Sequence, residues 1–117
     1  MCIRDSEYVY SLRNSLDIAA VNMSLGGGYY SSACDSRAPA IASVIDRLTS
    51  AGIAVVIAAG NSGMNGYISY PACIRNAIAV GSSNKNDGLS RFSNHSTLID
   101  LVAVSYTHLT LPTTPYV

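Results

Sequence analysis

The chain has 117 residues, a formal net charge of zero and only 12% charged residues, which is about half the usual share. A chain of this length accommodates at most one small domain, and the lack of a basic patch argues against nucleic acid as a partner. The longest apolar run is far shorter than the roughly 20 residues that span a membrane, so no membrane association is expected. Residues 1–6 lack an apolar stretch and predict no signal peptide.

The first predicted elements are a helix that ends near residues 8–14 and a strand at residues 19–24, which is broken by the glycines at 26–28. Residues 38–50 predict a second helix with one buried stripe at helical spacing, formed by Ile41, Val44, Ile45 and Leu48. Asp35 or Ser36 can cap the start of this helix, and Pro39 suits its first turn. Gly52 is expected to end it.

Residues 53–59 are apolar at successive positions, which is typical of a central strand in a parallel sheet covered on both sides. Residues 19–59 therefore predict a right-handed βαβ unit. Further short strands are predicted at residues 78–81 and 98–103. The sequence thus favours an α/β fold.

The three cysteines, Cys2, Cys34 and Cys73, leave at least one thiol unpaired. Cys34 and Cys73 lie in turn-like segments that flank the same βαβ unit, so we predict a disulfide between them. Two separate buried thiols are the alternative. Cys2 is expected to be unpaired.

Two loops follow the predicted parallel strands, residues 24–28 and residues 60–63. Ligands bind at the carboxyl ends of such strands, so both loops are candidate site loops. Asn61 can donate two N–H bonds without carrying charge, as an oxyanion hole requires, although asparagine is also a common turn residue.

These segments resemble the subtilisin-like serine peptidases, or subtilases. The resemblance covers about residues 10–103 and is carried by Val21-Asn-Met-Ser-Leu-Gly-Gly27, Ala51-Gly-Ile-Ala-Val-Val-Ile-Ala-Ala-Gly-Asn61, Tyr70-Pro71, Asn76-Ala-Ile-Ala-Val-Gly81, Phe92-Ser93 and Asp100-Leu-Val-Ala103. Each string alone is weak, but their order and separations together are specific. The resemblance implies a three-layer α/β sandwich with a parallel sheet, incomplete in this chain, and proteolysis as the activity.

The resemblance also implies roles for particular residues. Asn61 matches the oxyanion-hole asparagine, and Tyr70-Pro71 matches a cis-prolyl turn. The strand edge on which a substrate backbone lies is matched by Ser24, Leu25 and Gly26. The walls of the pocket for the residue before the scissile bond are matched by Gly26, Gly27, Ala58, Ala59 and Gly60.

The Asp, His and Ser motifs of the catalytic triad, which occur in that order in subtilases, are not recognised in this sequence. Residues 1–6 and 105–117 continue no periodic pattern and resemble translated sequencing adaptors. We therefore predict a partial catalytic domain at residues 7–104 with non-native ends. Such a chain is expected to be inactive and poorly stable, because sheet edges and one sheet face would lack cover.

Other candidate residues have simpler interpretations. His95 is expected to be a solvated loop histidine, Asp17 a surface residue, and Ser24 and Ser62 structural residues. Gly26–Gly28 do not open directly into a helix, which disfavours a dinucleotide site.

A non-catalytic α/β module that binds peptides or nucleotides, and a pseudo-peptidase kept for peptide binding, remain alternatives. The resemblance further implies a polypeptide substrate, secretion and a monomeric intact enzyme. No cofactor or side-chain metal site is predicted. Backbone carbonyls around residues 72–75 are candidates for a weak Ca²⁺ site only.

Overall fold

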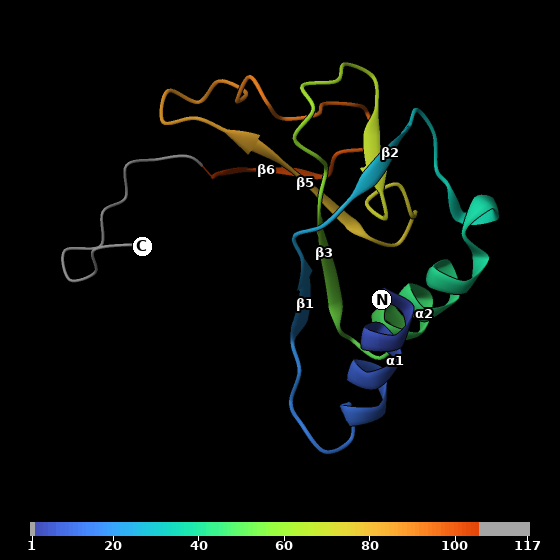
Figure 1. Ribbon diagram of the computed structural model, residues 1–117. Helices are drawn as coiled ribbons and strands as arrows, with labels where there is room; N and C mark the ends of the chain where they lie inside the picture. Colours follow the sequence, from blue (N-terminus) through green and yellow to red (C-terminus); the bar gives the residue numbers. More distant parts are fainter. Residues whose placement is uncertain (1, 106–117) are drawn as a thin grey trace.

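The computed structural model describes residues 2–105 (Figure 1). In chain order its elements are α1 (Cys2–Leu12), β1 (Ala20–Met23), β2 (Gly27–Tyr30), a 3₁₀ turn (Asp35–Arg37), α2 (Pro39–Ser50), β3 (Ala54–Ala58), β4 (Ile68–Tyr70), β5 (Ile78–Ser83) and β6 (Leu101–Val104). No helix among residues 2–105 has both the length and the apolarity that a membrane crossing requires.

Four strands form a sheet in the order β1-β3-β5-β6, and each neighbouring pair is parallel. The chain leaves β1, crosses over through α2 and returns to β3, which confirms the predicted βαβ unit. The α/β class is confirmed with it. Because the strands are parallel, their carboxyl ends meet at one edge of the sheet, where the loops after β1 and β3 lie.

Helix α2 forms where the sequence predicts it. Its stripe of four apolar side chains is buried, and Gly52 follows it with a φ of 81°. The predicted cap was wrong: Asp35 lies in the 3₁₀ turn, and Ala38 occupies the N-cap position without a side-chain hydrogen bond. Asp35 Oδ2 instead accepts the N–H of Arg75 at 3.2 Å, so its carboxylate ties the turn to the segment before β5.

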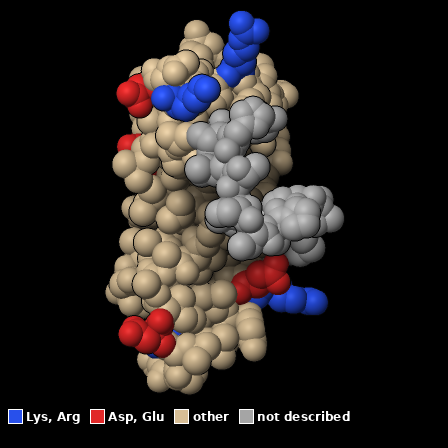
Figure 2. Space-filling model, turned by 90° about the vertical axis from the view of Figure 1, so that its left-hand side faces the viewer, with Lys and Arg blue, Asp and Glu red and all other residues tan. Residues whose placement is uncertain are grey.

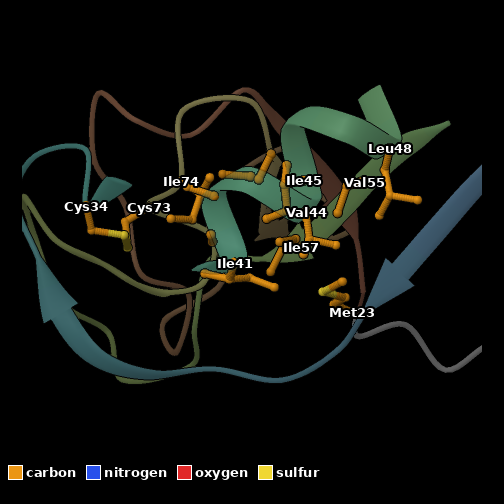
Figure 3. Packing of buried hydrophobic residues seen from close by; sticks show 14 of the residues in the cluster. Met23, Cys34, Ile41, Val44, Ile45, Leu48, Val55, Ile57, Cys73 and Ile74 are labelled. Carbon is orange, nitrogen blue, oxygen red and sulfur yellow. A yellow bond between two sulfur atoms is a disulfide. The ribbon is translucent and has the colours of Figure 1, made fainter. Parts of the chain in front are cut away.

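The core lies between α2 and one face of the sheet (Figure 3). On this face Met23, Val55 and Ile57 are buried against the helix, and all come from the two parallel strands of the βαβ unit, β1 and β3. Truncating such a side chain to alanine typically costs about 2–5 kcal/mol, so this layer holds β1 and β3 firmly against α2.

The other sheet face has no helix over it within residues 2–105, since α1 packs beside α2 on the same side (Figure 1). Side chains in β3 alternate between buried and half-buried, and the half-buried Val56 and Ala58 border a hollow of about 370 Å³ that also includes Val80 and Ala103. Two layers of the expected three-layer sandwich are therefore present. The apolar composition of β3 predicted cover on both sides, but composition does not say which chain segment supplies it.

Strand β6 and the β2–β4 pair differ from the prediction. Strand β6 starts at Leu101 rather than at residue 98, and Asp100 before it accepts the N–H of Ala79 at 2.8 Å. Strands β2 and β4 pair antiparallel and were not predicted, because β2 begins with two glycines and β4 has only three residues.

Helix α1 begins at Cys2 and ends at Leu12, within the range predicted for its end. It includes residues from the segment predicted to be non-native: Ser6 is buried, and the neighbouring Glu7 pairs with Arg47 of α2. The origin of the two ends stays a prediction, and residues 106–117 lie outside the described part of the chain.

The predicted disulfide is confirmed: Cys34 and Cys73 are bonded, with their Cα atoms 5.4 Å apart and 39 positions apart in the sequence. Both residues are buried, and the N–H of Cys34 also donates to the carbonyl of Cys73 at 3.0 Å. Cys2 is half-buried and has a free thiol. The bridge ties the segment before α2 to the segment after β4.

We predict that replacing both cysteines, Cys34→Ser with Cys73→Ser, lowers the free energy of unfolding by about 4 kcal/mol, because a long loop is released in the unfolded chain. Urea unfolding of the oxidised chain and the double variant measures this difference. Cys2→Ser is the matched control and should leave the midpoint nearly unchanged. Equal midpoints for all three proteins would contradict the prediction.

Candidate functional site

A cleft of about 540 Å³ opens at the carboxyl ends of β1 and β3. It is lined by Ser24, Leu25, Gly26, Gly27, Gly28, Tyr29, Ala58, Gly60, Asn61, Ser62 and Ser69. The structure thus brings together seven of the eight residues singled out from the sequence. Ala59, the eighth, is buried and borders the separate hollow of about 370 Å³ instead. Gly28 and Ser62 belong to the two predicted site loops but were given no binding role, and Tyr29 and Ser69 were not predicted to line the cleft.

Gly60 allows the chain to turn out of β3 into this cleft. Its φ is 110°, a region that side chains disfavour, and a Cβ added there would lie 2.3 Å from Asn94 Nδ2 and 2.4 Å from Ser69 Oγ. Only glycine therefore lets the backbone approach these two polar groups so closely.

Asn94, which sequence reasoning missed, holds the loop that carries Asn61. Its side chain is fully buried, and its Oδ1 accepts the N–H groups of Ser62 at 3.1 Å and Met64 at 3.0 Å. Its backbone N–H donates to the carbonyl of Gly60 at 2.9 Å. A lone asparagine in a polar segment gives no sequence signal for this role, because its partners lie about thirty positions away.

The segment around Asn94 also pairs with the loop through its backbone. Gly63 donates to the carbonyl of Phe92 at 2.8 Å, and the carbonyl of His95 accepts from Gly66 at 2.8 Å. The N–H of His95 donates to Met64 at 2.9 Å. His95 is thus a half-buried loop residue whose backbone supports the site, while Asp17 is exposed.

Asn61 itself is exposed at the rim of the cleft. Within residues 2–105 its side-chain amide has no hydrogen-bond partner, whereas the residues on either side of it are held. Its two N–H groups are therefore available to an acceptor in the cleft, and the amide remains neutral at any pH.

The opposite wall is formed by the segment after β1. Ser24, Leu25 and Gly26 are exposed, and none of them takes part in a backbone hydrogen bond with another residue of the range 2–105. A Cβ on Gly26 would lie 3.0 Å from Ser69 Cβ, so a side chain there would crowd the floor of the cleft. Across the cleft, Tyr29 Oη and Ser62 Oγ are 3.5 Å apart.

The peptide bond between Tyr70 and Pro71 is cis, as predicted. Tyr70 pairs with Gly27 in the β2–β4 ladder, next to the cleft wall. Burial raises the pKa of the Tyr70 phenol, with smaller contributions from Cys2 and Tyr30, so the phenol is neutral at neutral pH. The cleft is lined by small and apolar residues, serine and tyrosine hydroxyls and one free amide, and it contains no ionised side chain.

Charged side chains are sparse on the face shown in Figure 2, where they lie toward its upper and lower ends. Among residues 2–105 no three His, Cys, Asp or Glu side chains lie close enough together to hold a metal ion. Around residues 72–75 the carbonyls of Cys73 and Ile74 already accept N–H groups from Cys34 and Ala77. The weak Ca²⁺ site stays a prediction.

Residues 4–116 match the subtilase family. The chain belongs to this family. It is 38% identical over 85 residues to alkaline protease 1 of Aspergillus clavatus, which covers 73% of this chain and 19% of that protein. It is 41% identical over 83 residues to proteinase T of Parengyodontium album, covering 71% of this chain and 26% of that protein.

The fold agrees with this assignment. A solved lanthipeptide protease superposes with a TM-score of 0.70 at 20% identity, covering 89% of this chain and 34% of that one. The chain therefore spans about a fifth to a third of the proteins it resembles. The family match extends into both segments that the sequence predicted to be non-native.

We predict that Gly60→Ala destabilises the chain by about 2–5 kcal/mol, because strain at positive φ adds to a clash with Asn94 and Ser69. Gly52→Ala is the matched control: its φ is 81°, but a Cβ there meets nothing within 4 Å. It should cost only about 1–2 kcal/mol. Urea unfolding measures the free energy of unfolding of the two variants. An equal loss for both would show that the close approach at Gly60 does not affect stability.

Proposed function

We propose that this chain is part of a serine endopeptidase in which Asn61 stabilises the oxyanion formed during peptide-bond cleavage. One observation carries the proposal: a free neutral amide lies at the rim of a cleft, at the end of a central parallel strand, on a loop held by hydrogen bonds to the buried Asn94. A donor held in advance stabilises developing charge without reorganising during the reaction. Membership of the subtilase family supports peptide hydrolysis as that reaction.

The exposed backbone of Ser24, Leu25 and Gly26 is suited to pair with a polypeptide substrate as an added strand. The pocket for the side chain before the scissile bond would lie between Gly26 and Gly27 on one wall and Ala58 and Gly60 on the other. Because these walls carry almost no side chain, the pocket suits a large apolar residue. Ala59 does not line the cleft, and its carbonyl accepts hydrogen bonds from Ser69 and Asn94.

The chemistry would follow the serine peptidase scheme. A serine Oγ attacks the scissile carbonyl while a histidine takes the hydroxyl proton, and the carbonyl oxygen becomes the oxyanion that Asn61 binds. The histidine then protonates the leaving amine, and water hydrolyses the acyl-enzyme. No triad motif is recognised in this sequence, so we propose that the serine, histidine and aspartate are supplied by other parts of a longer protein.

We also propose an extracellular location and a monomeric intact enzyme. The disulfide supports the location, because such bonds persist in oxidising compartments. Polypeptides are the proposed partners, and no cofactor is needed for the scheme.

We predict that the 117-residue chain alone has no nucleophile that reacts as an activated serine. Incubation with a fluorophosphonate probe should give no labelling above a heat-denatured sample, while subtilisin E run in parallel is labelled. Specific labelling of a serine in this chain would overturn the proposal that the triad lies elsewhere.

In the longer protein, Asn61→Ala is expected to lower kcat by about 10²–10³-fold with KM nearly unchanged, since the donor acts on the transition state; this magnitude is the one known for subtilisin. Asn65→Ala, at an exposed asparagine just after the same loop, is the matched control and should leave both constants unchanged. Hydrolysis of a chromogenic peptide measures the effect. Equal kcat for Asn61→Ala and the parent would refute the oxyanion role.

A further inference from the structure

We propose that Asn94 is a positioning residue for catalysis, which fixes the loop at residues 60–64 so that Asn61 meets the oxyanion. This inference rests on the proposed role of Asn61 and adds a second asparagine that never touches substrate. Asn94 is fully buried and does not line the cleft. Any effect it has on the reaction must therefore pass through the loop.

Every polar group of the Asn94 side chain is used. Its Oδ1 accepts two loop N–H groups, and its Nδ2 donates to the carbonyl of Ala59 at 3.1 Å and lies 3.4 Å from Ser69 Oγ. The amide thus bonds to the last residue before Gly60 and to the loop on the far side of Asn61. A fully satisfied buried amide specifies one arrangement, because any other leaves a polar group unpaired.

Asn94 is in turn anchored to the sheet. Ser93 Oγ accepts the N–H of Ser82 in β5 at 2.9 Å and donates to the carbonyl of Asn94 at 2.9 Å. Ser82 Oγ is 2.7 Å from Ser90 Oγ, at the start of the same turn. The loop after β3 is therefore fastened through Asn94 and Ser93 to the neighbouring strand β5.

The hydrogen bonds of Asn94 explain how a loop can hold the Asn61 amide in place. The loop has two glycines at positive φ, Gly60 and Gly63, and its central residues are exposed, so its own sequence gives little rigidity. The hydrogen bonds from Asn94 supply this rigidity. Misplacing a reacting or stabilising group by about 1 Å can cost 10²-fold in rate. Removing these hydrogen bonds should therefore reduce turnover even though the cleft walls remain.

The first test measures the loop directly in the 117-residue chain. Amide hydrogen exchange of Ser62 and Met64 should become about 10-fold faster in Asn94→Ala, as expected for a lost hydrogen bond, while β3 and β5 keep their protection. The matched control is Asn84→Ala, because Asn84 Oδ1 also accepts two loop N–H groups, from Asn86 and Gly88, away from the cleft. It should leave Ser62 and Met64 unchanged.

The second test is a double-mutant cycle on kcat in the longer protein. Asn94→Ala should lower kcat by about 10²-fold with little change in KM. In the Asn61→Ala background the same substitution should cost less than about threefold, because the donor it positions is already gone. A purely structural role would lower the unfolding midpoint without this dependence on Asn61.

The outcomes separate the two proposals. If Asn61→Ala leaves kcat unchanged, the proposed function fails and the role of Asn94 fails with it, whatever the exchange data show. If Asn61→Ala lowers kcat but the two substitutions are additive, or exchange at Ser62 and Met64 does not change, only the role of Asn94 is overturned.

Asn94→Ser, which keeps a hydroxyl in the site, is the second variant. If both variants lose the native sheet, Asn94 is a folding residue and the proposal is overturned.

Discussion

The site depends on one close approach, that of the Gly60 backbone to the buried amide of Asn94. No side chain fits at Gly60, because a Cβ would lie within 2.4 Å of two polar atoms. The Asn94 side chain forms hydrogen bonds with the backbone on both sides of Asn61. The end of β3 is therefore set by the core beneath it and by this amide beside it, and Asn61 is left as the free donor.

The layers of the fold contribute to the site in different ways. Helix α2 and the buried face of β1 and β3 fix the sheet edge, and the disulfide ties the segments before α2 and after β4. The loops at that edge carry almost no charge, so the cleft offers neutral donors and exposed backbone rather than ionised groups. Such a surface suits a polypeptide, whose own backbone supplies matching donors and acceptors.

Sequence patterns were sufficient for α2, the βαβ unit and the two site loops, because these follow from local periodicity and from where parallel strands end. The disulfide was predicted from two turn-like segments that flank this unit, and the roles of most individual cleft residues were implied by the family resemblance. Strands β2 and β4 were missed because glycine and short length remove their periodic signal. The cap of α2 was misjudged because Asp35 bonds to Arg75, forty positions away. Asn94 was missed for the same reason, since its partners are distant in sequence and meet only in the fold.

The central claim concerns where the Asn61 amide points during the reaction. A crystal structure of the longer protein with a peptide aldehyde bound would place the oxygen of the tetrahedral adduct at the oxyanion position. The account predicts Asn61 Nδ2 within about 2.7–3.1 Å of that oxygen, with Asn94 still bonded to Ser62 and Met64. An adduct whose oxygen is bound by other groups, with Asn61 turned to solvent, would contradict it.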